Sequence, residues 1–345
     1  MAELVSLAEV RAAARRIVGV TVRTPLVPFR GAPGLLIKPE SLQPTGAFKL
    51  RGAYNAIQAL AEGEATRPNG VVAHSSGNHG FAVAYSAALL GIPAAIVVPE
   101  GAAKTKTDAI ESTGAELVYV EPTLPARVEA MLDIARTRGY APIPPFDDRL
   151  VIAGQGTIGL EIAEDLEGRP PRAVLVPIAG GGLISGIAVA VKALMPGTRV
   201  VGVEPELAAD ARESLRKGTR VAWPASDTAR TRADALRAEQ VGELTFPHIR
   251  ELVDDIVTVT EDEILSAMAA LALRARLVAE PGGAVAVAAA LSRTASELGL
   301  SRGTGTGIGT GDGDHAPVVA VLSGGNVDPD LLVRVLAARA ESYTG

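Results

Sequence analysis

Between residues 68 and 142, short apolar runs alternate with longer segments of helical periodicity, and this alternation restricts the fold more than any other feature. We expect strands at 71–74, 95–98 and 117–120, and helices at 78–90, 105–112 and 126–138. Such alternation is typical of parallel strands joined by crossover helices. The segment therefore predicts a small α/β domain.

Strands and helices are also expected on both sides of this segment. We expect strands at 35–38, 174–178, 200–203 and 317–322, and helices at 7–18, 50–60, 154–165, 182–194, 262–278 and 283–298. The pattern predicts an α/β fold in which residues 1–60 and 146–345 form a large doubly wound domain, with residues 68–142 as a smaller inserted α/β domain. Pro142, Pro144 and Pro145 are expected to form the linker back to the large domain.

Composition limits the possible functions. Hydrophobic residues make up 48% of the chain and aromatic residues only 3%, so we expect a core of Ala, Val, Leu and Ile. A net charge of −6 without a basic run argues against a nucleic-acid partner, and no apolar stretch is long enough to span a membrane. The absence of cysteine excludes disulfides, and with no signal-like N-terminus it favours a cytoplasmic protein. The glycine-rich stretch 302–314 is expected to be a surface insertion.

A single lysine stands where a polar turn gives way to a helix. The turn Gln43-Pro44-Thr45-Gly46 ends the preceding strand, and a periodic apolar run begins directly after Lys49. A helix N-terminus disfavours an ammonium group and lowers the pKa of the amine, so Lys49 is a candidate for covalent bonding to a carbonyl cofactor. The alternative is an ordinary surface lysine in a first helical turn.

Two other turns are candidates for binding anions. Residues 75–79 (Ser-Ser-Gly-Asn-His) lie between an expected strand and helix, where free backbone N–H groups can bind a carboxylate or phosphate. Gly180, Gly181 and Gly182 occupy the same position after a second strand, and three glycines let the backbone close around a phosphate. A serine helix cap in the first turn and a merely tight second turn are the alternatives.

These three stretches, in this order, resemble a known family. The sequence is similar to the serine/threonine dehydratase and serine racemase family of fold type II pyridoxal-phosphate (PLP) enzymes, which have a tryptophan synthase β-like fold. The resemblance extends from Thr24-Pro25-Leu26 to Ser323-Gly324-Gly325-Asn326, which is nearly the whole chain. It implies PLP as cofactor, a small amino acid as substrate and a homodimer.

The resemblance also implies roles for individual residues. Lys49 would hold PLP covalently, Asn78 would reach its phenolic oxygen, and Ser323 would meet its pyridine nitrogen. The cofactor-binding residues implied in this way are Phe48, Lys49, Asn78, Gly180, Gly181, Gly182, Leu183 and Ser323. The implied substrate-binding residues are Ser75, Asn78, His79 and Arg127. For Arg127, a solvent-exposed arginine in a first helical turn is the alternative.

Lys49 and Ser76 are the implied catalytic residues. The freed Lys49 amine would take the proton from the substrate's α-carbon. Ser76 matches the serine that faces this lysine across the cofactor in serine racemases, where many dehydratases have alanine. A hydroxyl on the second face could return the proton, which racemisation requires.

A metal site is implied by the same relatives. Glu204 and Asp210, with the carbonyl oxygen of Ala208, match a divalent-cation site that follows a buried strand. Oxygen ligands suit Mg²⁺ or Ca²⁺, with Mn²⁺ as a further possibility, and such a cation would act structurally.

One segment departs from the family pattern. Relatives have Ala-Asp-Gly where this chain has Ala233-Asp234-Ala235, and Ala238 and Glu239 replace the racemase serines. The segment thus resembles the dehydratases, whereas Ser76 resembles the racemases.

We therefore predict a PLP-dependent hydroxy-amino-acid ammonia-lyase that acts on L-threonine or L-serine. The alternatives are a serine racemase with side dehydratase activity, a 3-hydroxyaspartate dehydratase and a catalytically inactive PLP-binding protein. A nicotinamide oxidoreductase is disfavoured because residues 180–182 lack the spaced Gly-x-Gly-x-x-Gly pattern.

Overall fold

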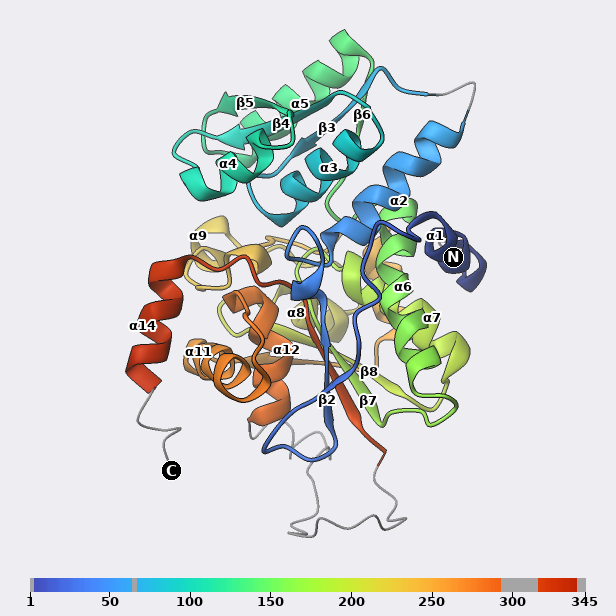
Figure 1. Ribbon diagram of the computed structural model, residues 1–345, viewed down its shortest axis with the longest axis vertical. Coiled ribbons are helices and arrows are strands. Elements are labelled where there is room, and N and C mark those ends of the chain that lie inside the picture. The colour runs from blue at the N-terminus through green and yellow to red at the C-terminus, as the bar shows by residue number, and fades with distance from the viewer. Residues whose placement is uncertain (1–2, 64–66, 293–315, 340–345) are drawn as a thin grey trace.

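The computed structural model describes residues 3–63, 67–292 and 316–339. Its strands form two sheets, one of six strands and one of four, and Figure 1 shows the smaller sheet above the larger one. The expected 302–314 insertion lies outside the described residues.

The larger sheet has the order β1-β2-β10-β7-β8-β9. Its strands are β1 (Val27–Pro28), β2 (Leu35–Pro39), β7 (Ala173–Pro177), β8 (Arg199–Pro205), β9 (Asp255–Val259) and β10 (Val318–Leu322). β2, β10, β7, β8 and β9 run parallel, and β1 pairs antiparallel with β2. The expected strand at 317–322 pairs with both β2 and β7 near the middle of the sheet.

Helices cover both faces of this sheet. Successive side chains in its strands point to opposite faces and therefore pack into two separate cores. Leu175 of β7 packs in one core with α11 (Glu261–Ala270) and α12 (Pro281–Leu291). Val174 and Val176 pack in a second core with α6 (Arg149–Asp165), α7 (Gly182–Leu194), α8 (Asp210–Lys217) and α10 (Thr245–Leu252). The expected doubly wound α/β architecture is confirmed.

The smaller sheet has the order β5-β4-β3-β6, and all its pairs are parallel. Its strands are β3 (Gly70–His74), β4 (Ala94–Pro99), β5 (Glu116–Val120) and β6 (Tyr140–Pro142). One core packs it against α2 (Lys49–Glu62), α3 (Asn78–Leu89) and α4 (Lys104–Glu111), and another packs it against α5 (Leu124–Arg138). These strands fall within residues 68–142, and the domain boundaries themselves stay a prediction.

The remaining elements are short or peripheral. They are α1 (Leu7–Arg16), η1 (Glu40–Leu42), α9 (Ala225–Thr228), η2 (Asp234–Leu236), the π-helix η3 (Leu271–Ala275) and α14 (Pro329–Arg339). Within the described ranges, no helix is long and apolar enough to cross a membrane.

Several expected boundaries were wrong. The helix expected from 154 begins at Arg149, because Asp148 caps it by accepting a hydrogen bond from the Val151 N–H group. The helix expected to reach residue 278 ends with η3, where Arg276 takes a left-handed conformation (φ 62°). Strands β1, β6 and β9 and helix α14 were not predicted. The helix expected to reach 298 is described only to Leu291.

Candidate active site

A cavity of about 350 Å³ opens at the carboxyl ends of strands from both sheets. The cavity is lined by His74 at the end of β3, Pro177 at the end of β7 and Ser323 directly after β10. Open parallel sheets bind ligands at these carboxyl ends. Every cofactor- and substrate-binding residue expected from the sequence lines this cavity: Phe48, Lys49, Ser75, Asn78, His79, Arg127, Gly180, Gly181, Gly182, Leu183 and Ser323. Ser76, the second expected catalytic residue, also lines it.

Lys49 is the first residue of α2 and is partly buried. Its Nζ donates a hydrogen bond to the carbonyl oxygen of Pro145 at 2.6 Å and lies 5.0 Å from the centre of the Phe48 ring. Burial lowers the pKa of Lys49 to about 8. The direction of this shift was predicted correctly from the sequence, but its cause is burial and not the helix dipole.

The turn after β3 presents backbone donors to the cavity. Gly77 precedes α3, and its N–H group donates to the Ser75 hydroxyl at 3.2 Å. Among the described residues, no side chain caps α3, so its first N–H groups are available to an anion.

His79 lies deeper than a substrate-contacting residue was expected to lie. Its side chain is buried, and its Nε2 is 2.8 Å from the carbonyl oxygen of Ile143, so Nε2 carries the proton and donates. Burial and the charge of Lys49 lower the pKa of His79 to about 3, so the imidazole is neutral. Its role in binding substrate stays a prediction.

The glycine turn after β7 forms the start of α7. Gly181 is the N-cap with φ +94°, a conformation that favours glycine. A Cβ at Gly180 would lie 2.2 Å from the Phe146 ring, and the Gly180 carbonyl accepts a 2.7 Å hydrogen bond from the Thr245 hydroxyl. Phe146 and Thr245 thus restrict the shape of the turn. Among the described residues no side chain caps α7, so the first N–H groups of this helix are free.

Ser323 ties the end of β10 to the lysine turn. Its carbonyl oxygen accepts a hydrogen bond from the Phe48 N–H group at 3.0 Å, and Ala47 forms a bridge with Gly324. The side chain of Ser323 is buried at the edge of the cavity. These contacts hold the lysine turn, which follows β2, next to the carboxyl end of β10.

The small-sheet side of the cavity carries two basic groups. Arg127 lies on α5, where its Nε donates to the Thr123 carbonyl at 3.3 Å, so it is both a cavity residue and anchored to its own helix. Lys106 of α4 forms a 2.6 Å ion pair with Asp234 of η2, and both line the cavity.

Comparison with known proteins decides the family. The model of the pyridoxal-phosphate dependent enzyme family matches residues 18–323. The chain belongs to this family. PLP is therefore its cofactor class, as the resemblance implied.

Relatives and solved structures agree with this result. The chain is 41% identical to a serine racemase of Arabidopsis thaliana and 41% identical to a catabolic L-threonine dehydratase of Escherichia coli K12; each match covers 85% of this chain and 83% of the relative. A crystal structure of a T.th. threonine deaminase is 44% identical with a TM-score of 0.83, covering 94% of this chain and 99% of that one. A maize serine racemase structure is 34% identical with a TM-score of 0.86, covering 99% and 100%. The fold type II expectation is confirmed.

The residues of the cavity fit PLP. The uncapped N-terminus of α7 suits the phosphate, the Lys49 amine suits the carbonyl carbon, and the buried Ser323 hydroxyl can pair with the ring nitrogen. The imidazole Nδ1 of His79 is buried without a hydrogen-bond partner among the described residues, as in a site that a polar ligand completes.

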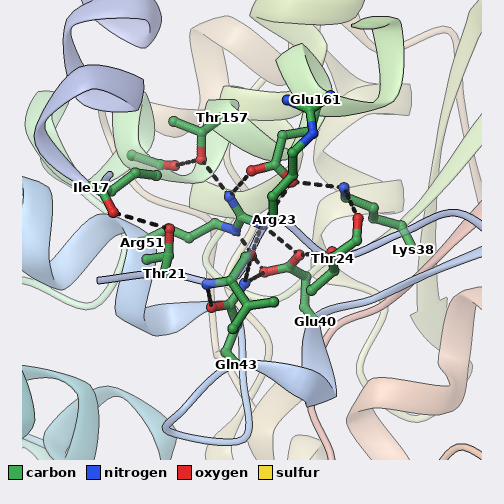
Figure 2. Close-up of polar contacts among 12 residues, drawn as sticks. Ile17, Thr21, Arg23, Thr24, Lys38, Glu40, Gln43, Arg51, Thr157 and Glu161 are labelled. Carbon is green, nitrogen blue, oxygen red and sulfur yellow. Dashed lines mark hydrogen bonds and ion pairs between the residues drawn. The ribbon is translucent and has the colours of Figure 1, made fainter. Parts of the chain in front are cut away.

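A buried ion network fixes the start of α2, as Figure 2 shows. Arg51 donates to both oxygens of Glu40, at 2.7 and 2.9 Å, and to both oxygens of Glu161, at 2.6 and 2.9 Å. Lys38 donates to Glu161 at 2.7 Å and to the Thr24 carbonyl at 2.6 Å. Because Arg51 is two residues after Lys49, the network holds the helix that carries the reactive amine.

Glu280, Lys106 and Asp234 also line the cavity, and this was not predicted from the sequence. For Glu280 a signal existed: Glu-Pro-Gly-Gly stands before an apolar run, which indicates a helix start with a carboxylate at its N-cap position. The Lys106–Asp234 pair spans 128 residues and left no local signal.

The expected metal ligands lie away from the cavity, at the end of β8. Glu204 accepts hydrogen bonds from the Ala211 and Arg212 N–H groups, at 3.0 and 2.8 Å. Burial and the charge of Asp210 raise the pKa of Glu204 well above its usual value, and burial raises that of Asp210 to about 7. The Oδ2 of Asp210 has no hydrogen-bond partner in the described part of the chain.

Proposed function

We propose that this PLP-dependent enzyme is an ammonia-lyase that converts L-threonine to 2-oxobutanoate, or L-serine to pyruvate, with release of ammonia. The main support for this proposal is that one cavity is lined by Lys49, the 75–79 loop, the uncapped start of α7 and Ser323. The names of the relatives, threonine dehydratase and serine racemase, support the same substrates.

When bound, PLP supplies an electron sink next to the substrate's α-carbon. The free N–H groups at the start of α3 bind the substrate's carboxylate, with Ser75 fixing the turn. Lys49 Nζ accepts the α-proton, for which its low pKa suits it. The uncharged Ser323 hydroxyl cannot fully protonate the ring nitrogen as an acid would, which favours prompt loss of the β-hydroxyl group.

Serine racemisation is the second candidate, because Ser76 lines the cavity together with Lys49. The purified enzyme should be incubated with L-threonine, L-serine and 3-hydroxyaspartate, and oxo acid, ammonia and D-isomer should be measured. We expect oxo acid and ammonia in equal amounts from L-threonine or L-serine. D-serine formed faster than pyruvate would contradict the lyase proposal. Binding of PLP without any turnover would favour the inactive-protein alternative.

Ser76→Ala separates the two activities. Elimination uses Lys49 alone, whereas racemisation also needs a proton donor on the other face, a role proposed for Ser76. We expect oxo-acid formation from the L-substrate to stay within about tenfold of wild type, a barrier change of about 1.4 kcal/mol or less. Any formation or turnover of D-serine should disappear. Loss of elimination while PLP stays bound would refute the two-face assignment.

We also propose that a divalent cation binds Glu204, Asp210 and the Ala208 carbonyl. What supports it is the buried carboxyl pair and the unpartnered Asp210 oxygen. No group of three His, Asp or Glu side chains that could hold a metal occurs among the described residues, so carbonyl and water oxygens must complete the coordination. The cation would offset two buried negative charges and stabilise the fold.

Chelation tests this cation. A cation at a free concentration about a hundredfold above its Kd stabilises the native state by about 2.7 kcal/mol. Chelator should therefore lower the melting temperature, and Mg²⁺ should restore it. The Glu204→Ala, Asp210→Ala double variant is the matched control and should not respond. An equal response in this variant, or none in wild type, would exclude the site.

The homodimer, the cytoplasmic location and the lack of a nucleic-acid partner stay predictions. Sedimentation of the holoenzyme at several concentrations measures the first of these.

A further inference from the structure

A row of side-chain hydrogen bonds crosses one edge of the cavity. Asn326 Nδ2 donates to the Thr45 carbonyl at 2.8 Å and to Asn78 Oδ1 at 2.7 Å. Asn78 Nδ2 donates to Glu280 Oε1 at 2.6 Å. Because a carbonyl can only accept, the Thr45 contact fixes which end of each amide points where. The oxygen of Asn78 therefore faces Asn326, and its NH₂ group faces Glu280.

Glu280 is held in place by the backbone that follows Ser323. Its N–H group donates to the Gly324 carbonyl at 3.1 Å, and a Cβ at Gly324 would lie 2.1 Å from Glu280 Oε1. Glu280 occupies the N-cap position of α12, yet within the described chain its carboxylate makes no capping hydrogen bond. The side chain is 5% exposed and lines the cavity. Its contact with Asn78 therefore replaces the usual capping role.

We propose that Glu280 is a positioning residue that orients the side-chain amide of Asn78 toward the bound cofactor. The inference rests on the PLP dependence described above. An amide nitrogen carries two N–H bonds, and Glu280 takes one of them. The other is left for an acceptor on the cofactor. Without the carboxyl group, Asn78 would keep only the contact with Asn326 and could rotate about it.

The protonation of Glu280 gives this arrangement a pH response. Burial and the charge of Asp234 raise the pKa of Glu280 to about 7, against the opposing effects of the Asn78 hydrogen bond and the Lys106 charge. Two charged groups act on it, Asp234 on η2 and Lys106 on α4. Lys49 is a further titratable group on the wall of the same cavity. Oε1 can accept from Asn78 in both forms, but only the ionised form places a negative charge at the edge of the cavity.

The first test compares Glu280→Gln with Glu280→Ala. Glutamine keeps an acceptor oxygen and loses the charge, whereas alanine removes both. We expect Glu280→Ala to weaken PLP binding by the apoenzyme at least about tenfold, the loss of roughly one hydrogen bond to a charged group. It should also shift the absorption maximum of bound PLP. Glu280→Gln should restore both properties to near wild type, and the melting temperature of the three apoenzymes should agree closely.

The second test follows the absorbance of bound PLP against pH. Wild type should show a step near pH 7 that Glu280→Gln lacks. Asp234→Asn should move the midpoint to lower pH, and Lys106→Met should move it to higher pH. Lys104→Met, on the exposed face of the same helix α4, is the matched control and should leave it unchanged.

The outcomes separate this inference from the proposed function. A wild-type protein that binds no PLP would contradict the proposed function. A Glu280→Ala variant that matches wild type in PLP affinity and spectrum would overturn the positioning role alone. A step near pH 7 that persists in Glu280→Gln would do the same for the pH response.

Discussion

Lys49→Ala should lower kcat/KM for the L-substrate at least about a thousandfold, because it removes both the covalent anchor of the cofactor and the general base. Steady-state oxo-acid production measures this loss. Lys104→Ala is the control: Lys104 is exposed and paired with Asp108, so activity should not change. A Lys49→Ala variant that keeps a tenth or more of wild-type activity would contradict the assignment.

The lowered pKa of Lys49 adds a pH dependence. At pH 7 a pKa of about 8 leaves roughly one amine in ten neutral, against roughly one in three thousand at the ordinary value of 10.5. Because only the neutral amine can bond to a carbonyl carbon, PLP uptake by the apoenzyme should rise with pH and level off above about pH 8. The folded pKa lies below the unfolded one, so the unfolded chain binds more protons between these values and stability should rise with pH across them.

Arg51→Met should lower the free energy of unfolding by about 3–5 kcal/mol, because it leaves Glu40 buried without its ion-pair partner and leaves Glu161 paired with Lys38 alone. Both the Arg51 and Glu40 side chains are fully buried, so water cannot replace the lost contacts. Denaturant unfolding followed by circular dichroism measures the change. Arg138→Met breaks an exposed pair with Glu116 and should leave the midpoint nearly unchanged.

A second substitution checks that the loss comes from the unpaired charge. Adding Glu40→Gln to Arg51→Met removes the carboxylate that has lost its ion-pair partner and should recover part of the stability, whereas Glu40→Gln alone should destabilise. Burial raises the pKa of Glu40, but the charge and hydrogen bonds of Arg51 and the charge of Lys38 together lower it. Its stabilising effect is therefore present above its unfolded pKa and is lost as the pH falls. Strict additivity of the two substitutions would mean that the pair is not coupled.

The buried parallel strands could be predicted from the sequence because they are continuous apolar runs, as in β3 and β10. β9 was missed because it is an edge strand in which only Ile256 and Val259 are buried. β6 was missed because it has three residues and ends in proline. These strands acquire their structure from the neighbour they pair with, which the local pattern does not reveal.

The start of α6 was predicted at Gly154, five residues too late. Gly154 and Gly156 lie inside the helix, at its crossings with α2 and α7. A Cβ at Gly154 would lie 2.6 Å from the Arg51 carbonyl oxygen, and one at Gly156 would lie 2.8 Å from that of Gly186. Glycine is required there by close helix packing and not by a turn.

The candidate site could be listed from the sequence because its turns follow strands of parallel sheets, whose carboxyl ends meet. The contacts that orient the side chains of the site could not be predicted from the sequence. Asn78 and Glu280 are 202 residues apart, and Arg51 and Glu161 are 110 apart. Acidic residues at such positions look like ordinary helix-start or surface charges until the fold brings their partners to them.

Borohydride reduction of the holoenzyme, followed by peptide mapping, tests the central claim most directly. Reduction makes the bond between cofactor and lysine permanent, so the modified peptide identifies the lysine that holds PLP. We predict a single pyridoxyl group on Lys49. A pyridoxyl group on Lys38, Lys104 or Lys192, or no modified lysine in a protein that has bound PLP, would contradict the account.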